Sequence, residues 1–479
     1  MPGSAAHTFF AIPELFCLLS AHVPQSDLTQ CSLVCKEWSR QFQPKLWVNV
    51  IFTERFMRLI NEVPSPAATA LTRNLGHIRE VIFPAVNPSH LQLLIQGLPE
   101  QLNDTVTEPK SLCTNLRLIY FRTIDSDRLD RLDFISKPLL TLLNNNLRLT
   151  YLYVFVDILN IEGFSAALSK LQHLQHLTVH SDSETDYIPE PLLFLRSCLG
   201  LPELTELHFE SGVEIHWDDG DEATIRRELE AVIHEASVVR FSGRDDAKKI
   251  KQVTFPSNCE KRRNPLPLLL LKSNLLDLQE CVIPGFGPDA SLQEIEQVVR
   301  EHCSEIKHLE FSDVHEANGP AVRAFIRGCS GLRSFTSLPY NECLEDEPLL
   351  VLSELVSWHR TTLEILDIQP VGVSSHYLQE ILSCCMQLKR FHAMATDWIG
   401  VSSITYWDMS RSDWVCTKLR ELYLTVNRWS PERDEQEEVE QTPDGRHLCS
   451  DRCRCTSKRA FQQIGRLEML EVLDISIDR

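Results

Sequence analysis

The chain has 479 residues, of which 43% are hydrophobic and 24% are charged, an ordinary composition for a folded protein. That length is large for one compact core, so we expect several domains or an extended array of repeats. The formal net charge of −20 argues against nucleic acid as a partner, because proteins neutralise phosphates with Lys and Arg, and it favours basic partners instead.

No segment of the sequence is expected to cross a membrane. The most apolar run, residues 265–271, is stopped by Lys272 and is far too short. The N-terminus lacks the basic region and the small-residue cleavage site of a secretory signal. Sixteen cysteines in a chain without such a signal indicate reduced thiols, so the expected location is the cytoplasm, the nucleus or both.

The first fifty residues predict short apolar helices. Pro13 suits the first position of one helix, and Pro24 is expected to end it. Ser26 or Asp27 is expected to cap a second helix, and Pro44 to interrupt it. One apolar stripe runs along this second helix at intervals of three and four, formed by Leu28, Cys31, Val34, Cys35 and Trp38. Helices this short cannot bury all of these side chains alone, so they need the rest of the chain or a partner.

This segment resembles an F-box. The likeness rests on the order and spacing of Ile12-Pro13-Glu14-Leu15, Asp27-Leu28, Val34-Cys35-Lys36, Trp38 and Leu46-Trp47. One departure is that Glu14 directly follows Pro13, where the family usually has a residue between them. The resemblance implies a three-helix domain over 9–52 that docks on the Skp-type adaptor of a cullin–RING ubiquitin ligase.

The resemblance also implies which residues contact that adaptor: Ile12, Pro13, Leu15, Leu19, Leu28, Val34, Cys35 and Trp38. The alternative is a small helical cap that only covers the end of a larger domain. A proline-containing stretch follows, and we expect a linker over 53–70.

From residue 71 to residue 479 the sequence repeats. Each copy has apolar residues spaced three, three and two, as in Leu171-Leu174-Leu177-Val179. The third residue of each copy, called here the repeat position, falls at 81, 119, 152, 177, 207, 253, 281, 309, 335, 366, 391, 422 and 473. Between 253 and 422 the steps are 25 to 31 residues, a period typical of leucine-rich repeats.

A leucine-rich repeat array predicts an α/β solenoid, with a curved parallel sheet inside and helices outside. Each repeat position should lie on a strand. Helices are expected between the strands, over residues 289–300, 321–326 and 374–382 for example.

Five cysteines recur six residues before a repeat position: Cys113, Cys303, Cys329, Cys385 and Cys416. They resemble the cysteine-containing class of leucine-rich repeat, which is common beside F-boxes. We expect small buried side chains rather than disulfides or metal ligands, because one cysteine in each repeat places them a layer apart.

Two long steps predict insertions, near 211–248 and 426–460. The first holds an acidic run, 218–222, expected to be a solvated loop, and then a helix over 223–234. The second holds His447, Cys449, Cys453 and Cys455. Cys449 and Cys453 are spaced as zinc ligands can be, but the single residue between Cys453 and Cys455 is awkward for zinc. A loop with free thiols is the alternative, so we assign no metal and no cofactor.

Alternate side chains of a strand face opposite ways, so the neighbours of each repeat position should line the concave face. The residues expected to meet a protein target there are Tyr120, Tyr151, Tyr153, His176, His208, Glu310, His392 and Tyr423. Tyrosines are good binding anchors. The alternative is that these polar side chains are simply solvated.

No phosphate-binding loop, nucleophile motif or paired-histidine helix is present in the sequence. The two resemblances together imply a non-catalytic substrate receptor of an SCF-type ubiquitin ligase. The F-box would bind the adaptor and, through it, a cullin, and the repeats would bind an unidentified protein target. A leucine-rich-repeat scaffold outside any ligase is the second hypothesis, and a zinc-dependent enzyme built on the Cys449 loop is the third.

Overall fold

The computed structural model describes residues 22–61, 65–84, 88–96, 113–122, 132–181, 187–188, 190–210, 213–215, 217, 222–241, 248–256, 265–273, 275–283, 291–311, 319–337, 347–368, 373, 375–393, 403–427 and 458–478. The chain divides into two compact units. The first unit is Met1–Leu204 with Val238–Lys248, and the second is Thr205–Ser237 with Lys249–Arg479. Within the described ranges, no helix is both long enough and apolar enough to cross a lipid bilayer.

The first unit begins with helices α3 (Gln25–Val34) and α4 (Lys36–Leu46). The expected single apolar stripe is wrong, because the helix breaks at Cys35, whose backbone is extended at φ −161° and ψ 168°. The N-cap of α3 is Pro24, not Ser26 or Asp27. Pro44 does not end α4 but lies within its last turn, where its missing N–H removes a single helical hydrogen bond.

A parallel sheet follows in the first unit. Its strands lie in chain order: β1 (Asn49–Ile51), β2 (Glu80–Phe83), β3 (Leu118–Phe121), β4 (Tyr151–Phe155) and β5 (His176–His180). The register aligns the repeat positions Val81, Ile119, Leu152 and Leu177 in one row, and all four side chains are buried. The predicted strands at these repeat positions are therefore confirmed.

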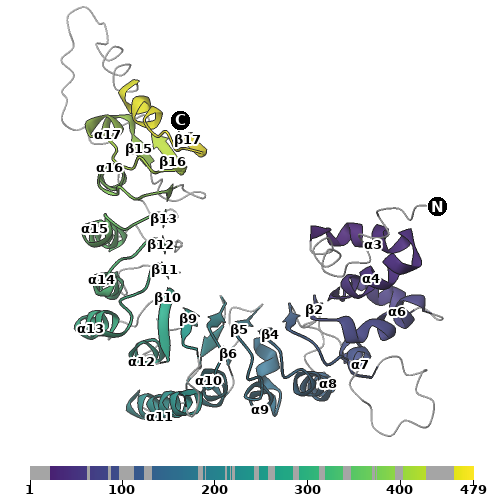
Figure 1. The fold of residues 1–479 in the computed structure, drawn as a ribbon. Helices are drawn as coiled ribbons and strands as arrows, with labels where there is room; N and C mark the ends of the chain where they lie inside the picture. Colours follow the sequence, from purple (N-terminus) through teal and green to yellow (C-terminus); the bar gives the residue numbers. More distant parts are fainter. Residues whose placement is uncertain are drawn as a thin grey trace, which may run out of the picture. The chain divides into compact units, whose positions relative to one another are not determined.

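Helices connect these strands and lie along one face of the sheet (Figure 1). They are α5 (Glu54–Asn61), α6 (Pro66–Asn74), α7 (Pro88–Gln96), α8 (Leu132–Asn145), α9 (Phe164–Leu168) and α10 (Pro191–Leu199), with 3-10 turns η1 (Leu75–His77) and η4 (Val156–Asn160) and a short strand β6 (Tyr187–Ile188). Over 53–70, where a linker was expected, the described residues include α5 and the start of α6. Apolar side chains of this stretch are buried, among them Met57, Ile60 and Ala68, so it packs as part of the first unit.

The sheet of the second unit is also parallel. Its strands are β7 (Glu206–Phe209), β9 (Ile250–Thr254), β10 (Leu276–Ile283), β11 (His308–Phe311), β12 (Ser334–Ser337), β13 (Ile365–Ile368), β14 (Arg390–Ala393), β15 (Ser403–Thr405), β16 (Glu421–Asn427) and β17 (Val472–Asp478). They follow chain order except that β15 and β17 both pair with β16. The repeat positions from 207 to 422 are aligned and buried, whereas Leu473 on β17 is 47% exposed.

The helices of the second unit are α11 (Glu222–Phe241), α12 (Leu266–Lys272), α13 (Leu292–His302), α14 (Gly319–Gly328), α15 (Glu347–His359), α16 (Ser375–Cys384) and α17 (Tyr406–Arg411). From Val238 onward, α11 belongs to the first unit. A short strand, β8, covers Glu214–Ile215. The helices expected within 223–234, 289–300, 321–326 and 374–382 are confirmed as parts of α11, α13, α14 and α16, with α13 starting at Leu292 after the N-cap Ser291. Helices α12 to α16 contact one another in chain order along one face of the strands (Figure 1).

The contact between α13 and α14 requires a glycine. A Cβ atom on Gly328 would lie 2.7 Å from Val299 Cβ and 3.0 Å from the Glu296 carbonyl oxygen. Such a separation is far inside van der Waals contact, so the two helices approach this closely because position 328 has no side chain.

Buried polar side chains hold adjacent repeats together in the first unit. The Asn146 side chain accepts a hydrogen bond from the Leu116 N–H (2.8 Å) and donates to the Cys113 carbonyl (2.9 Å). Arg240 is fully buried and donates to the carbonyl oxygens of Lys248 (2.8 Å), Leu199 (3.2 Å) and Leu204. Burial lowers the pKa of Arg240 to about 10. These bonds satisfy carbonyl groups that a purely apolar core would leave unpaired.

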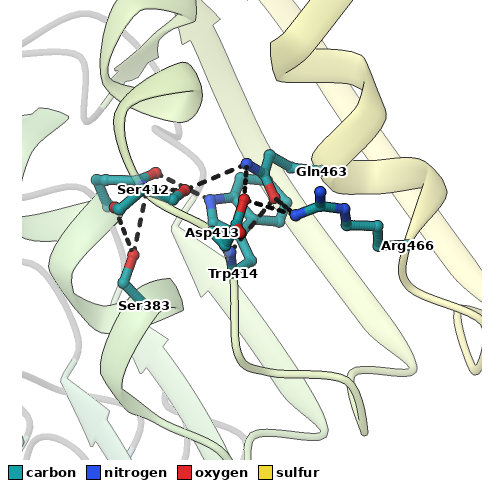
Figure 2. Close-up of polar contacts among 7 residues, drawn as sticks. Ser383, Ser412, Asp413, Trp414, Gln463 and Arg466 are labelled. Carbon is teal, nitrogen blue, oxygen red and sulfur yellow. Dashed lines mark hydrogen bonds and ion pairs between the residues drawn. The ribbon is translucent and has the colours of Figure 1, made fainter.

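A polar network fixes the helical segment 458–465 to the second unit (Figure 2). The Gln463 side chain accepts from the Trp414 N–H (3.3 Å) and donates to the carbonyl of Ser412 (3.2 Å), while Arg466 pairs with Asp413 at 2.6 Å. Gln463 and Trp414 are both buried. The chain on both sides of residues 428–457 is thus anchored to the same repeat.

Candidate functional site

Part of the expected adaptor surface lies outside the described residues, namely Ile12, Pro13, Leu15 and Leu19. The remaining members are on α3, on α4 and at the break between them. They divide into two groups, one buried and one exposed.

Leu28 faces inward. It is 5% exposed and packs with Phe42 in a small core between α3 and α4. Trp38 lies partly buried against this core, with its ring centroid 5.6 Å from that of Phe42. Leu28 therefore supports the helices rather than offering its own surface to a partner. Phe42 was not expected, because it lies beyond the apolar stripe that the sequence suggested.

Val34 faces outward. It is 62% exposed, and its neighbour Leu33 is 75% exposed. Cys35 is exposed at the start of α4, where its Sγ accepts a weak hydrogen bond from the Trp38 N–H at 3.5 Å. Leu33 is off the predicted stripe, one residue before the end of α3. The C-terminal end of α3 thus presents two aliphatic side chains that the described part of the chain leaves uncovered.

The expected target-binding residues of the first unit do lie on the open face of its sheet. The Tyr120 and Tyr153 rings stack with centroids 4.0 Å apart, and the Tyr151 ring lies 5.8 Å from that of His176. Tyr153 is largely buried in this stack. His180, which the sequence analysis did not select, lies 5.6 Å from the Tyr153 ring.

Aliphatic residues extend this aromatic group across the neighbouring strands. The register aligns Ile51 and Ile82 with Tyr120 and Tyr153. Ile51 is exposed, and Ile82 and Leu118 are half-buried. The open face of the first unit therefore groups aromatic and aliphatic side chains on adjacent strands, beside polar ones such as Glu80 and Thr178.

The second unit presents a more polar open face. The rings of His392 and Tyr423 are 5.0 Å apart, and His392 Nδ1 is 3.1 Å from Asp367 Oδ1. His208 Nδ1 lies 2.9 Å from the Thr254 hydroxyl. Glu310 is half-buried on the same face, and its pKa is raised by burial and by the neighbouring Glu280 and Asp367 carboxylates.

The five repeated cysteines are buried thiols, as expected. Burial raises the pKa to about 12 for Cys113, Cys303, Cys385 and Cys416, and raises it for Cys329 as well. A thiol held in the protonated form is a poor nucleophile and a poor metal ligand.

Within the described ranges, no group of three or more His, Cys, Asp or Glu side chains is arranged to hold a metal ion. The low-priority zinc candidates His447, Cys449, Cys453 and Cys455 lie outside those ranges. No family model matches the chain, and no curated protein matches it either.

Proposed function

We propose that this chain is the substrate-recognition subunit of an SCF-type ubiquitin ligase. In this proposal residues 9–52 form an F-box that binds a Skp-type adaptor, and the repeats form a curved leucine-rich-repeat solenoid that binds a protein target. The protein would have no catalytic chemistry of its own. It would work in the cytoplasm or the nucleus, where such ligases meet their targets.

The observation that carries the proposal is the exposed apolar end of α3. Leu33 and Val34 are more than half exposed within the segment that resembles an F-box. Contiguous exposed apolar side chains, unlike scattered ones, are the kind of surface that a protein interface covers. The small core of Leu28 and Phe42 holds α3 and α4 together, so this surface is preorganised for docking.

The mechanism would be proximity. One end of the chain holds the adaptor, the repeats hold the target, and the ligase then acts on lysines of the target. Holding two reactants together converts an encounter in solution into a local one. The half-buried Tyr120 and Tyr151 side chains of the first unit support target binding, because rigid aromatic residues lose little conformational freedom when they are buried.

Co-purification tests the proposal against the scaffold hypothesis. The full-length chain would be expressed with an affinity tag in a eukaryotic cell, and its partners identified by mass spectrometry with and without residues 1–52. A ligase receptor recovers the adaptor and the cullin, and loses both on truncation. Recovery of repeat-binding partners without adaptor or cullin would identify a scaffold instead.

A further inference from the structure

A buried histidine connects the repeats of β12 and β13 in the second unit. His359 is the last residue of α15 and is 1% exposed. Its Nε2 lies 2.9 Å from the Ile326 carbonyl oxygen, and its Nδ1 lies 3.4 Å from the Leu332 backbone nitrogen. Both of these residues belong to the preceding repeat. We call this pair of hydrogen bonds the His359 bridge.

The two partners fix the protonation state of the imidazole. A carbonyl oxygen can only accept a hydrogen bond, so Nε2 has to carry the hydrogen in the contact with Ile326. A backbone N–H can only donate, so Nδ1 has to be unprotonated in the contact with Leu332. The neutral ring therefore satisfies both backbone groups. The protonated ring cannot, because its Nδ1–H would face the Leu332 N–H.

The first unit forms the equivalent contact with an amide side chain. Leu116 lies three residues before repeat position 119, as Leu332 does before repeat position 335. The Leu116 N–H donates to the Asn146 side chain at 2.8 Å. Both contacts thus satisfy the same N–H of the repeat. Since an asparagine does not gain a proton in mild acid and a histidine does, only the contact in the second unit can titrate.

The elements packed against His359 carry ionisable side chains. They lie on α14, on α15, on α16 and in the turns after these helices: Arg323, Arg327, Cys329, Arg333, Glu354, Arg360 and Glu380. Arg327 pairs with Glu296 and Glu354, and burial raises the pKa of the Cys329 thiol, which is therefore neutral. Among the residues that the structure describes, no carboxylate pairs with His359. A charge on its imidazole would therefore be buried without a counter-ion, at a cost in free energy.

The direction of the pH effect follows from this environment. Burial lowers the pKa of His359, and the bond to the Ile326 carbonyl raises it by a smaller amount. The unfolded chain therefore binds a proton at this residue more tightly than the folded chain does. The stability that the bridge contributes is complete above the unfolded-state pKa of about 6.5, and it is lost as the pH falls towards the lower folded-state pKa.

We propose that the His359 bridge is a pH-sensitive connection between the repeats of β12 and β13, formed while the imidazole is neutral and broken when it is protonated. These two strands pair Thr336 with Asp367 on the open face, so breaking the bridge loosens the support of that part of the face. The inference concerns the second unit alone and does not depend on the proposed function.

Hydrogen exchange followed by mass spectrometry tests the inference on the full-length wild-type protein, at roughly pH 7.5 and pH 5.5. Exchange rates are corrected for their intrinsic dependence on pH. Protection of peptides that contain Leu332 should fall about tenfold at the lower pH, whereas peptides that contain Leu116 should change by less than about twofold. An equal loss in both regions would indicate general acid unfolding and overturn the proposal, as would unchanged protection at Leu332.

A substitution that removes the titration provides the second test. His359→Gln keeps a neutral donor and acceptor, so protection at Leu332 should stay within about twofold between the two pH values. The matched control is His302→Gln, at an exposed histidine that ends α13, and it should keep the pH dependence of the wild type. Persistence of the effect in His359→Gln, or its loss in His302→Gln, would overturn the proposal. If His359→Gln does not fold, the wild-type comparison of Leu332 with Leu116 decides.

Discussion

At the scale of single residues, the sequence pattern identifies which side chains are buried, but not which ones form hydrogen bonds to the backbone of a neighbouring repeat. The repeat positions follow from spacing because each of them contacts equivalent residues of the neighbouring repeats. Asn146 and Arg240 could not be predicted in the same way. Their partners are backbone carbonyl and N–H groups as far as 41 residues away along the chain, and no local pattern indicates such a partner.

Asn146 lies six residues before repeat position 152, where five other repeats have cysteine. Replacing it with the cysteine of those repeats should destabilise the first unit by about 2 kcal/mol, because the Leu116 N–H and the Cys113 carbonyl lose their side-chain partner. The urea unfolding midpoint measures this. Asn144→Cys, at an exposed position two residues earlier in the last turn of α8, is the control and should shift the midpoint far less; equal shifts would contradict the bridging role.

Cysteine reactivity should separate one exposed thiol from the core ones. Brief iodoacetamide treatment of the native protein, followed by peptide mapping, should modify Cys35 and spare Cys113, Cys303 and Cys416. Burial raises the pKa of those three thiols to about 12, whereas Cys35 is exposed. Modification of the buried thiols at the same rate as Cys35 would show that the core is open.

The stability of the second unit should depend on the charge of Glu310. Burial, Glu280 and Asp367 raise the folded-state pKa of this carboxyl above its unfolded value. The folded state therefore binds a proton more tightly than the unfolded state does. The charged Glu310 carboxylate lowers the stability of the folded state at neutral pH, and this loss disappears as the pH falls through the folded-state pKa towards the unfolded-state pKa.

Glu310→Gln removes this penalty. The variant should be more stable than the wild type at pH 7, and the difference should disappear below about pH 4, where the carboxyl is protonated in both states. Urea unfolding at several pH values measures it. A variant that is less stable at pH 7, or a difference that grows as the pH falls, would contradict the assigned electrostatics.

At the scale of helices and strands, the sequence is most informative where several repeats share a pattern. The strands at residues 253 to 422 recur at similar steps, and the structure confirms each of them. The N-terminal helices occur once, so their boundaries rest on single residues. Cys35 there ends α3 and caps α4, a role that cysteine seldom has. Strand β1 escaped prediction for the same reason, since its pairing with β2 depends on a repeat that begins about 30 residues later.

Gly328 tests how closely helices of adjacent repeats must pack. Gly328→Ala should destabilise the second unit by roughly 1–3 kcal/mol, because the new methyl group overlaps Val299. Gly331→Ala lies three residues away, where a Cβ atom has no neighbour within 4 Å, and should be neutral within about 0.5 kcal/mol. Chemical denaturation of both variants measures these changes in stability. If Gly328→Ala did not change the stability, α13 and α14 could move apart at little cost in free energy.

At the scale of the whole chain, composition and period predict an α/β protein with parallel strands and helices, and that much is confirmed. The predicted boundary at residue 71 does not mark where the sheet begins, because β1 starts at Asn49. The division near residue 204 was not anticipated either, since the apolar pattern continues without interruption across it. The identity of the partners stays a prediction, because an exposed surface indicates what kind of side chains a partner contacts but not which protein that partner is.

The central claim is that the C-terminal end of α3 is a protein interface. Two substitutions of the same residue type test it most directly: Val34→Asp, at a position 62% exposed on α3, and Val239→Asp, at a position 64% exposed on α11, both in the first unit. Binding to a purified Skp-type adaptor should weaken by about 2 kcal/mol or more, roughly thirtyfold in Kd, in Val34→Asp, and stay unchanged in Val239→Asp. Equal affinity of Val34→Asp and wild type, with both proteins folded, would contradict the account.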